Sequence, residues 1–323
     1  VTVALAGQPN VGKTSVFNLL AGLSQHVGNW PGKTVEQKTG GLTYEGLSLR
    51  IVDLPGTYSL TANSPEEQVA REFIIRERPD VVVVVVDAAT LERNLYLLAE
   101  LLHLPSPVIL ALNMMDVAEQ QGVHVEPHVL EAALGIPVVP MVASRNQGME
   151  QLLQTIAALL RGQSPYQPCR PEIRADHRQV LAELQGLIGP YVPDPYPPDW
   201  VALKLLEGDV EVTRLVRERL PAEVWDGVQA ILHQHEDAVL AVAGGRYDWI
   251  GRMVRAAVVR PRAGRITVTE RVDRVATHPF WGLVLLAAVM GVIFWMTYAI
   301  ALPVQRWMGS VLVQGLAGWA GRL

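Results

Sequence analysis

The sequence predicts an α/β domain with a mostly parallel six-stranded sheet, then a small all-α domain, then one transmembrane helix. Three observations lead to this prediction. Strand-like and helix-like segments alternate over residues 1–162, which is the pattern of a parallel sheet covered on both faces. Residues 171–260 show helical patterns only. Residues 279–305 carry no charged side chain, and about 20 apolar residues suffice to cross a bilayer as a helix.

Six segments are expected to form strands, of which VVVVVV at 81–86 is the clearest, because a continuous apolar run is typical of a strand buried on both faces. The turn Glu45-Gly46 predicts a hairpin and so an antiparallel edge. The expected strands are Val1–Ala6, Gly41–Tyr44, Leu47–Val52, Val81–Val86, Val108–Leu112 and Val138–Val142. The expected helices are Lys13–Leu23, Ser64–Glu77, Leu91–His103, Pro127–Ala133 and Met149–Leu160.

The composition changes at Gly162-Gln163-Ser164-Pro165, where we place the start of the helical domain. A basic linker over 261–278 leads into the transmembrane helix 279–305, and 306–323 is expected to begin a further membrane region. Seven arginines lie between 252 and 274, and only Arg306 and Arg322 follow the apolar segment. The positive-inside rule therefore predicts that residues 1–278 are cytoplasmic. A buried helix of a soluble protein is the alternative, but such a helix seldom lacks a polar face for so long.

Composition narrows the class further. A chain of 323 residues with 50% hydrophobic residues is long enough for about two domains. The net charge of −5 gives no general argument for nucleic-acid binding. Cys169 is the single cysteine, so no internal disulfide forms, as expected in a reducing compartment. The opening VTVALAG lacks a Met and a secretory signal, which suggests a fragment or a processed start.

The segment GQPNVGKT matches the phosphate-binding pattern G-x-x-x-x-G-K-[ST] between a predicted strand and a predicted helix. Its N–H groups and the helix N-terminus favour phosphate oxygens. Lys13 is expected to contact the β- and γ-phosphates, and Thr14 to offer its hydroxyl to Mg²⁺. The expected nucleotide-binding residues of this loop are Gly7, Gln8, Pro9, Asn10, Val11, Gly12, Lys13, Thr14 and Ser15.

Two further segments fit the same site. The sequence DLPG follows a predicted strand, so Asp53 is expected to hold Mg²⁺ through water and the Gly56 N–H to contact the γ-phosphate. Thr34 lies in a loop where a threonine completes the Mg²⁺ shell when γ-phosphate is present; the alternative is a solvated loop threonine. Lys13, Thr34 and Gly56 are the expected catalytic groups. The expected nucleotide contacts here are Gly32, Lys33, Thr34, Asp53, Leu54, Pro55 and Gly56.

The segment ALNMMD follows a buried strand where a GTP-binding domain places Asn-Lys-x-Asp, with Met114 in the lysine position. Asp116 can accept from guanine N1–H and the 2-amino group, and adenine lacks this donor pair. Asn113 is expected to tie the base loop to the phosphate loop, and Met114 keeps an apolar stem against the purine. The segment VASRNQG, with Val142, Ala143 and Ser144, is expected to supply a backbone N–H to guanine O6. These motifs predict a Ras-like P-loop GTPase.

The chain resembles the FeoB family of bacterial ferrous-iron transporters along nearly its whole length. The resemblance rests on GQPNVGKTSVFNLL, HVGNWPGKTVE, DLPGTYSL and LNMMD in the G domain, WVALKLLEGD in the helical domain, and DRVATHPFWG at the membrane entry. It implies a GTPase portion with a helical domain that favours GDP retention, attached to a multi-pass inner-membrane protein carrying Fe²⁺. It also implies K⁺ held by Asn10, which is otherwise a loop-shaping residue, and suggests small accessory proteins and a homo-oligomer as partners.

Thr57 occupies the position where many GTPases carry a water-orienting glutamine, and its side chain is too short for that role. Hydrolysis is therefore expected to be slow and to depend on Lys13, Mg²⁺, backbone donors of the Gly28–Thr34 loop and K⁺. A soluble regulatory or ribosome-assembly GTPase is the alternative function, disfavoured by the apolar segment and by the lack of a dense basic patch. An ATPase pump is disfavoured by Asn113 and Asp116. His233 and His235 lie two apart on an expected helix, so we interpret them as solvated or packing residues.

Overall fold

The computed structural model describes residues 1–22, 25–30, 33, 35–61, 64–173, 175–259 and 276–309. The chain divides into two units, Val1–Arg260 and Pro261–Leu323. The first unit contains both the α/β domain and the helical domain.

The α/β domain is built on one seven-stranded sheet with the order β2-β3-β4-β1-β5-β6-β8. The strands β4, β1, β5, β6 and β8 run parallel, whereas β2 and β3 are antiparallel to their neighbours. This arrangement confirms the predicted fold class, with the hairpin at Glu45-Gly46 between β3 and β4. The strands are β1 Thr2–Gly7, β2 Gln25–Asn29, β3 Glu36–Tyr44, β4 Leu47–Asp53, β5 Val81–Asp87, β6 Val108–Asn113 and β8 Val138–Pro140.

The sheet has one strand more than the six that the sequence predicts. All five residues of β2 are exposed, and they pair with β3 by backbone hydrogen bonds alone. No side-chain alternation accompanies this edge strand, so the hydrophobic pattern gives no sign of it.

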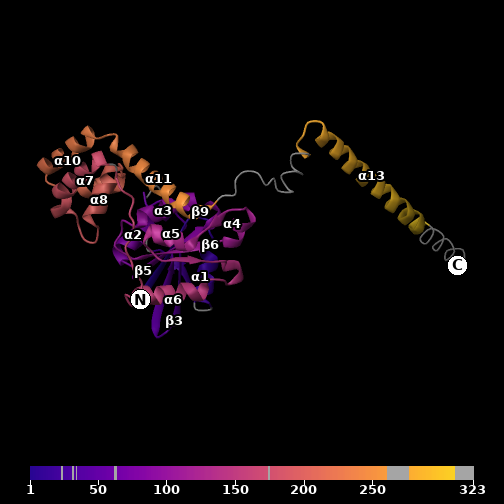
Figure 1. The fold of residues 1–323 in the computed structure, drawn as a ribbon, viewed down its shortest axis with the longest axis horizontal. Coiled ribbons are helices and arrows are strands. Elements are labelled where there is room, and N and C mark those ends of the chain that lie inside the picture. Colours follow the sequence, from indigo (N-terminus) through magenta and orange to yellow (C-terminus); the bar gives the residue numbers. More distant parts are fainter. Residues whose placement is uncertain are drawn as a thin grey trace, which may run out of the picture. The chain divides into compact units, whose positions relative to one another are not determined.

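Helices cover both faces of the sheet, as Figure 1 shows. The helices of the α/β domain are α1 Lys13–Ala21, α2 Pro65–Glu77, α3 Leu91–Leu101, α4 Met115–Gln120, α5 Pro127–Leu134 and α6 Met149–Leu160, with 3₁₀ turns η1 Ala88–Thr90 and η2 Ala143–Arg145. The helical domain consists of α7 Ala175–Ile188, η3 Gly189–Tyr191, α8 Pro198–Leu206, α9 Val210–Arg217, α10 Ala222–Gln234 and α11 Ala238–Ala257.

Strand β5 contributes to a separate hydrophobic core on each face of the sheet. Val81, Val83 and Val85 pack into the core under α1 and α6. The even-numbered valines of the same run pack into the other core, which also holds residues of α2 and α3. The alternation of side chains along a strand explains this division, and it confirms that VVVVVV is buried on both faces.

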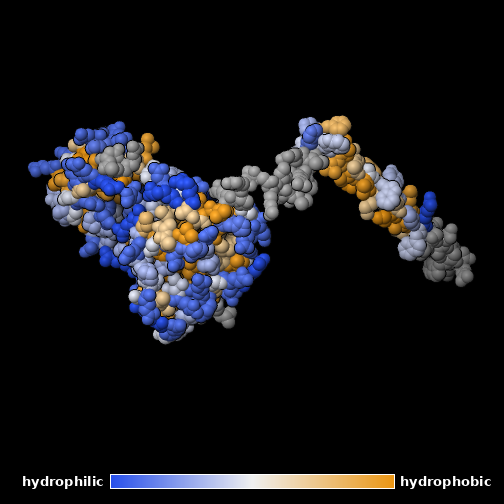
Figure 2. Space-filling view, in the orientation of Figure 1, coloured by the Kyte–Doolittle hydropathy of each residue, from blue (hydrophilic) through white to orange (hydrophobic). Residues whose placement is uncertain are grey.

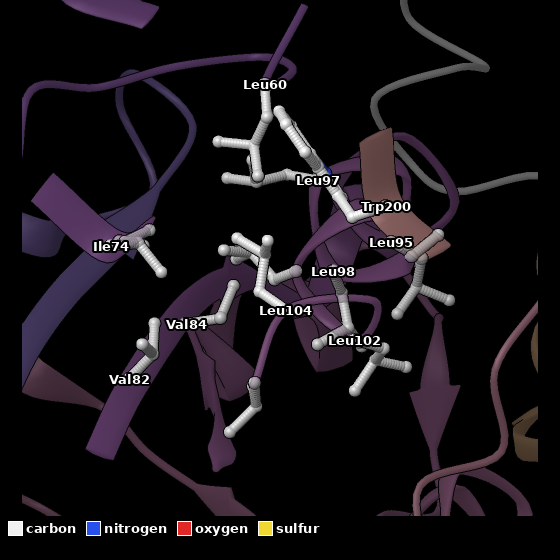
Figure 3. Close-up of a cluster of buried hydrophobic side chains, with 14 of the residues drawn as sticks. Leu60, Ile74, Val82, Val84, Leu95, Leu97, Leu98, Leu102, Leu104 and Trp200 are labelled. Atoms are coloured by element: carbon white, nitrogen blue, oxygen red, sulfur yellow. The ribbon is translucent and has the colours of Figure 1, made fainter. Parts of the chain in front are cut away.

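The second of these cores continues into the helical domain. Leu60, from the loop after β4, lies with Leu97 of α3 and Trp200 of α8 in one buried cluster (Figure 3). The chain then returns to the α/β domain, where β9 Val258–Val259 pairs antiparallel with β7 His124–Val125. The two domains therefore share one hydrophobic core.

The second unit contains α13, Trp281–Met308, which is the one helix long and apolar enough to cross a membrane among the described residues. An 18-residue stretch of this helix has a mean hydropathy of 2.3, and none of the helix's hydrophobic side chains is buried. Figure 2 shows predominantly hydrophobic residues along the visible face of this helix. A soluble protein would bury such a surface, so a lipid environment matches its composition.

Candidate nucleotide-binding site

The loop between β1 and α1 is shaped by two glycines that admit no side chain. A Cβ on Gly7 would lie 2.5 Å from the carbonyl oxygen of Val85, in the neighbouring strand β5. A Cβ on Gly12 would lie 2.4 Å from Nδ2 of Asn113, and Gly12 has φ +84° at the N-terminus of α1. The backbone can thus turn tightly and present its N–H groups at the start of the helix, where an anion is favoured.

Asn113, at the end of β6, connects the three loops of the expected site. Its buried side chain donates from Nδ2 to the carbonyl of Val11 at 2.9 Å. The same amide accepts from the N–H of Ala143 through Oδ1 at 3.0 Å. This buried amide, whose NH₂ group and oxygen each have a hydrogen-bond partner, therefore fixes the phosphate loop, the β6–α4 loop and the β8–η2 loop relative to one another.

Lys13 and Asp53 form an ion pair at the mouth of the phosphate loop, with side chains only 10% and 8% exposed. Asp53 is the last residue of β4, and the loop after it is fastened to the phosphate loop. Thr57 donates its N–H to the carbonyl of Gly7 at 3.1 Å, and a Cβ on Gly56 would lie 3.3 Å from the nitrogen of Pro9. The DLPG segment therefore lies directly against the phosphate loop, as the motif spacing predicts.

Met114 lies between β6 and α4, close to the phosphate loop, and Asp116 lies in the first turn of α4. Met114 has φ +60°, and its Cε lies 3.6 Å from the position of a Cβ on Gly12. Asp116 Oδ2 lies 3.6 Å from a guanidinium nitrogen of Arg145, and a cavity of about 280 Å³ borders both residues. Sequence reasoning did not single out Arg145; its place in the motif loop opposite Asp116 was the available signal.

The expected nucleotide-binding residues differ in their exposure to solvent. The exposed ones, available to a ligand from solvent, are Pro9, Asn10, Thr14, Ser15 and Ser144, and the half-buried ones are Gly12, Lys13, Pro55, Gly56, Met114 and Asp116. Gly7, Gln8, Val11, Asp53, Leu54, Asn113, Val142 and Ala143 are buried. Gly32 and Thr34 lie outside the described residues, so their expected roles stay predictions.

Two side chains and one backbone N–H of the expected site have partners within the protein. The amide of Gln8 donates to the carbonyl of Arg93 in α3 at 2.8 Å, so this side chain is directed toward α3 rather than toward the phosphate loop. Lys33 donates to Gln68 of α2 at 3.0 Å. The N–H of Ala143 donates to Asn113. The N–H of Ser144 is therefore the one left for the expected contact with guanine O6.

A buried ion network connects the loop after DLPG to the helical domain. Glu100 of α3 accepts from the N–H of Leu60 at 2.5 Å and from Lys204 of α8 at 2.7 Å. Lys204 also donates to Glu207 at 2.7 Å, and Arg246 of α11 lies 3.5 Å from Glu100 and pairs with Glu207. All four ionic side chains are at most 10% exposed. No sequence motif marks this network, because its members come from four separate segments.

The charges of the network stabilise one another against the cost of burial. Burial by itself favours the neutral form of Glu100, but Lys204 and Arg246 outweigh it and hold the pKa of this carboxyl below its ordinary value. Burial likewise disfavours the charged form of Lys204, and Glu100 and Glu207 outweigh it, so the pKa of the ammonium is raised. Both groups are therefore ionised at neutral pH.

The donor set fits a hard divalent cation. Asp53 supplies a buried carboxylate and Thr14 a hydroxyl at the first turn of α1, and oxygen ligands of this kind suit Mg²⁺. Asn10 offers an amide oxygen from an exposed position with φ +68°, which fits a weakly held monovalent cation beside the phosphates.

Fold and site together define a P-loop nucleotide-binding protein with a guanine-type base motif. The sequence profile described as Ferrous iron transport protein B matches residues 1–156, and the profile of the FeoB cytosolic helical domain matches residues 175–259. The chain belongs to the FeoB family. This confirms the resemblance drawn from the motifs.

Relatives and solved structures agree with that assignment. A fusion of Fe(2+) transport protein A with Fe(2+) transporter FeoB from Porphyromonas gingivalis is 34% identical over 100% of this chain and 39% of its own length. Fe(2+) transporter FeoB of Escherichia coli K12 is 32% identical over 98% of this chain and 44% of its own length. The chain therefore spans less than half the length of these relatives. A GDP-bound mutant of S. thermophilus NFeoB superposes with a TM-score of 0.73 at 35% identity, over 80% of this chain and 100% of the other. The cytosolic domain of L. pneumophila FeoB gives a TM-score of 0.71 at 34% identity, again over 80% of this chain.

Proposed function

We propose that this chain is the GTP-binding and GTP-hydrolysing cytoplasmic portion of a bacterial inner-membrane Fe²⁺ transporter, and that the nucleotide state of its loops regulates uptake. The observation that carries the proposal is the pair of hydrogen bonds made by Asn113, three residues before Asp116. They connect this motif to Val11 of the phosphate loop and to Ala143. The membrane-type composition of α13 and the similarity to Fe(2+) transporters support the transport assignment. A soluble ribosome-assembly GTPase has no comparable use for α13.

The proposed division of the chain is a G domain over 1–162, a helical domain over 163–260, a linker over 261–278 and a membrane segment from 279 onward. The proposed partners are the lipid bilayer, small accessory proteins and further copies of the chain. The fusion partner in the P. gingivalis relative, a transport protein A, supports an accessory protein of that kind. Nucleic acid is not among the proposed partners.

The proposed hydrolysis uses few side chains. Lys13 exchanges its contact with Asp53 for the β- and γ-phosphate oxygens when nucleotide binds, and its charge offsets the charge that develops on them. Gly56 lies beside the phosphate loop, and its N–H would contact the γ-phosphate. Mg²⁺ held by Asp53, Thr14 and Thr34, and K⁺ at Asn10, would neutralise phosphate charge when bound. Thr57 is 2% exposed, which leaves its hydroxyl unable to orient an attacking water from solvent.

The loops that sense the nucleotide are linked to the helical domain by two routes. Leu60 is bonded to Glu100 and through it to Lys204 of α8. Lys33 is bonded to Gln68, which donates to Glu211 of α9 at 2.5 Å. A conformational change in either loop on loss of the γ-phosphate would therefore alter its contacts with the helical domain. This coupling is the basis of the proposed regulation.

Competition binding tests the nucleotide assignment. Residues 1–260 should prefer GTP and GDP over ATP, because Asp116 pairs donors that adenine lacks. Asp116→Asn should weaken GTP by up to roughly 10⁴-fold and improve xanthosine nucleotides, whose 2-position carries an oxygen. Glu223→Gln, an exposed carboxylate in the first turn of α10, is the matched control and should leave the selectivity unchanged. ATP affinity equal to that of GTP would contradict the proposal.

A further inference from the structure

Two imidazoles and one carboxylate meet in the helical domain, on elements that contribute nothing to the nucleotide site. His177 lies in the first turn of α7, His235 ends α10, and Asp237 precedes α11. One candidate ligand atom from each lies within 4.8 Å of the other two. Within the described part of the chain, this is the one group of three or more His, Cys, Asp or Glu side chains with such spacing.

The spacing within the group suits a metal ion better than a direct hydrogen bond. Nε2 of His177 lies 3.4 Å from Oδ1 of Asp237, which is long for a bond whose usual length is about 2.9 Å. Metal–ligand bonds of about 2.0–2.2 Å place neighbouring tetrahedral ligands roughly 3.3 Å apart. The rings of His177 and His235 have centroids 5.9 Å apart at 75°, so they meet edge to face rather than in a stack. Modest rotations of His235 and Asp237 would bring all three ligand atoms to one centre.

The three proposed ligands differ in burial, so the core fixes one side chain and the other two can change their rotamers. His177 is 4% exposed and continues the buried stripe of α7 formed by Val180, Leu184 and Ile188. The side chain of Asp237 is 73% exposed, and His235 is half-buried. A core histidine with an aspartate neighbour would account for His177 and Asp237 alone, but not for the second imidazole beside them. The exposed side leaves room for water at the remaining coordination positions.

We propose that His177, His235 and Asp237 bind one divalent transition-metal ion of the Fe²⁺, Co²⁺ and Zn²⁺ class. Two neutral imidazoles and one carboxylate suit these ions, whereas Mg²⁺ and Ca²⁺ prefer oxygen ligands. The bound ion would fasten the start of α7 to the turn between α10 and α11. This site is independent of the transport assignment, since it depends on no residue of the nucleotide site or of α13.

Equilibrium titration with Co²⁺ tests the proposal, because the visible absorption of Co²⁺ reports its coordination. The 323-residue chain in detergent is titrated in excess Mg²⁺, which occupies oxygen-rich sites and leaves imidazole sites free. One Co²⁺ per chain should bind with a micromolar dissociation constant. His235→Ala and Asp237→Asn, both outside the core, should each weaken binding by at least about tenfold. His233→Ala is the matched control, because His233 is 79% exposed, lies two residues away, and contacts Glu236 instead.

The outcomes separate this proposal from the nucleotide assignment. Binding of Co²⁺ that is unchanged in His235→Ala, or equally weakened in His233→Ala, would overturn the metal site, as would the absence of saturable Co²⁺ binding by the parent chain. GDP affinity measured on the same samples should be the same in all three variants. A chain that binds Co²⁺ as expected but fails to bind GDP would keep the metal site and contradict the proposed function.

Discussion

The buried network between the two domains makes Lys204→Met a sharp test of the interface. Lys204 is 1% exposed and holds two carboxylates at 2.7 Å each, Glu100 and Glu207. Methionine keeps most of the length and the apolar stem of lysine, so the change removes a charge and creates little cavity. Breaking a buried ion pair from one side costs about 3–5 kcal/mol. Arg246 remains near both carboxylates, so we expect the lower end, about 3 kcal/mol.

Urea unfolding of residues 1–260 at neutral pH, followed by circular dichroism, measures this loss of stability. Lys38→Met is the matched control, because the Lys38–Glu36 pair is 3.6 Å long and its side chains are 31% and 56% exposed. Such an exposed pair contributes less than about 1 kcal/mol. The double variant Glu100→Gln/Lys204→Met should recover at least half of the loss, since glutamine still accepts from the N–H of Leu60 and no unpaired carboxylate remains at position 100.

The pH dependence of the stability difference tests the same prediction independently. Glu100 has a lowered pKa in the folded protein, so its contribution is present above its unfolded pKa of 4.5 and is lost as the pH falls through the folded value. Lys204→Met removes the main cation that lowers this pKa, and Glu100 can then take up a proton at higher pH. The difference between parent and variant should therefore be largest at neutral pH and shrink as the pH falls, first through the folded pKa of Glu100 in the variant and then through its lower folded pKa in the parent. A loss no larger than that of Lys38→Met, or one independent of pH, would refute this account of the network.

Three other predictions concern the nucleotide site and the membrane segment. Met114→Lys should change GTP binding by less than about 1.5 kcal/mol, because the stem against Gly12 is preserved; a loss beyond tenfold in a binding titration would mean that the apolar tip is needed. Single-turnover hydrolysis should be far slower than the roughly 1–100 s⁻¹ of kinases and faster in KCl than in NaCl, and Asn10→Ala should erase the salt difference while leaving GDP affinity nearly intact. Equal parent rates in the two salts would remove the cation from the mechanism. In inside-out vesicles, protease should reach residues 1–260, and their protection would reverse the predicted orientation.

Local patterns in the sequence were enough for the fold class and for the outline of the nucleotide site. The spacing of GQPNVGKT and DLPG predicts which strand ends would carry phosphate contacts, because parallel strands bring their carboxyl ends to one edge of the sheet. The uncharged run around Trp295 needed only its length to indicate a membrane helix, and VVVVVV needed only its continuity to indicate a strand covered on both faces. Each of these inferences needs no tertiary information, because it depends on residues that are neighbours in the chain.

The tertiary structure decided everything that depends on residues distant in the chain. The edge strand Gln25–Asn29 forms through backbone pairing that leaves no side-chain pattern. The side chain of Gln8, in the phosphate loop, donates to the carbonyl of Arg93 in α3, a partner that no motif indicates. Glu100 belongs to no motif of the sequence, and folding buries it between the backbone of Leu60 and the side chain of Lys204. His235, which helical spacing alone suggests is solvated or packing, meets His177 because α7 and α10 pack together. Charges and imidazoles far apart in sequence are juxtaposed only by packing, and no periodicity encodes that.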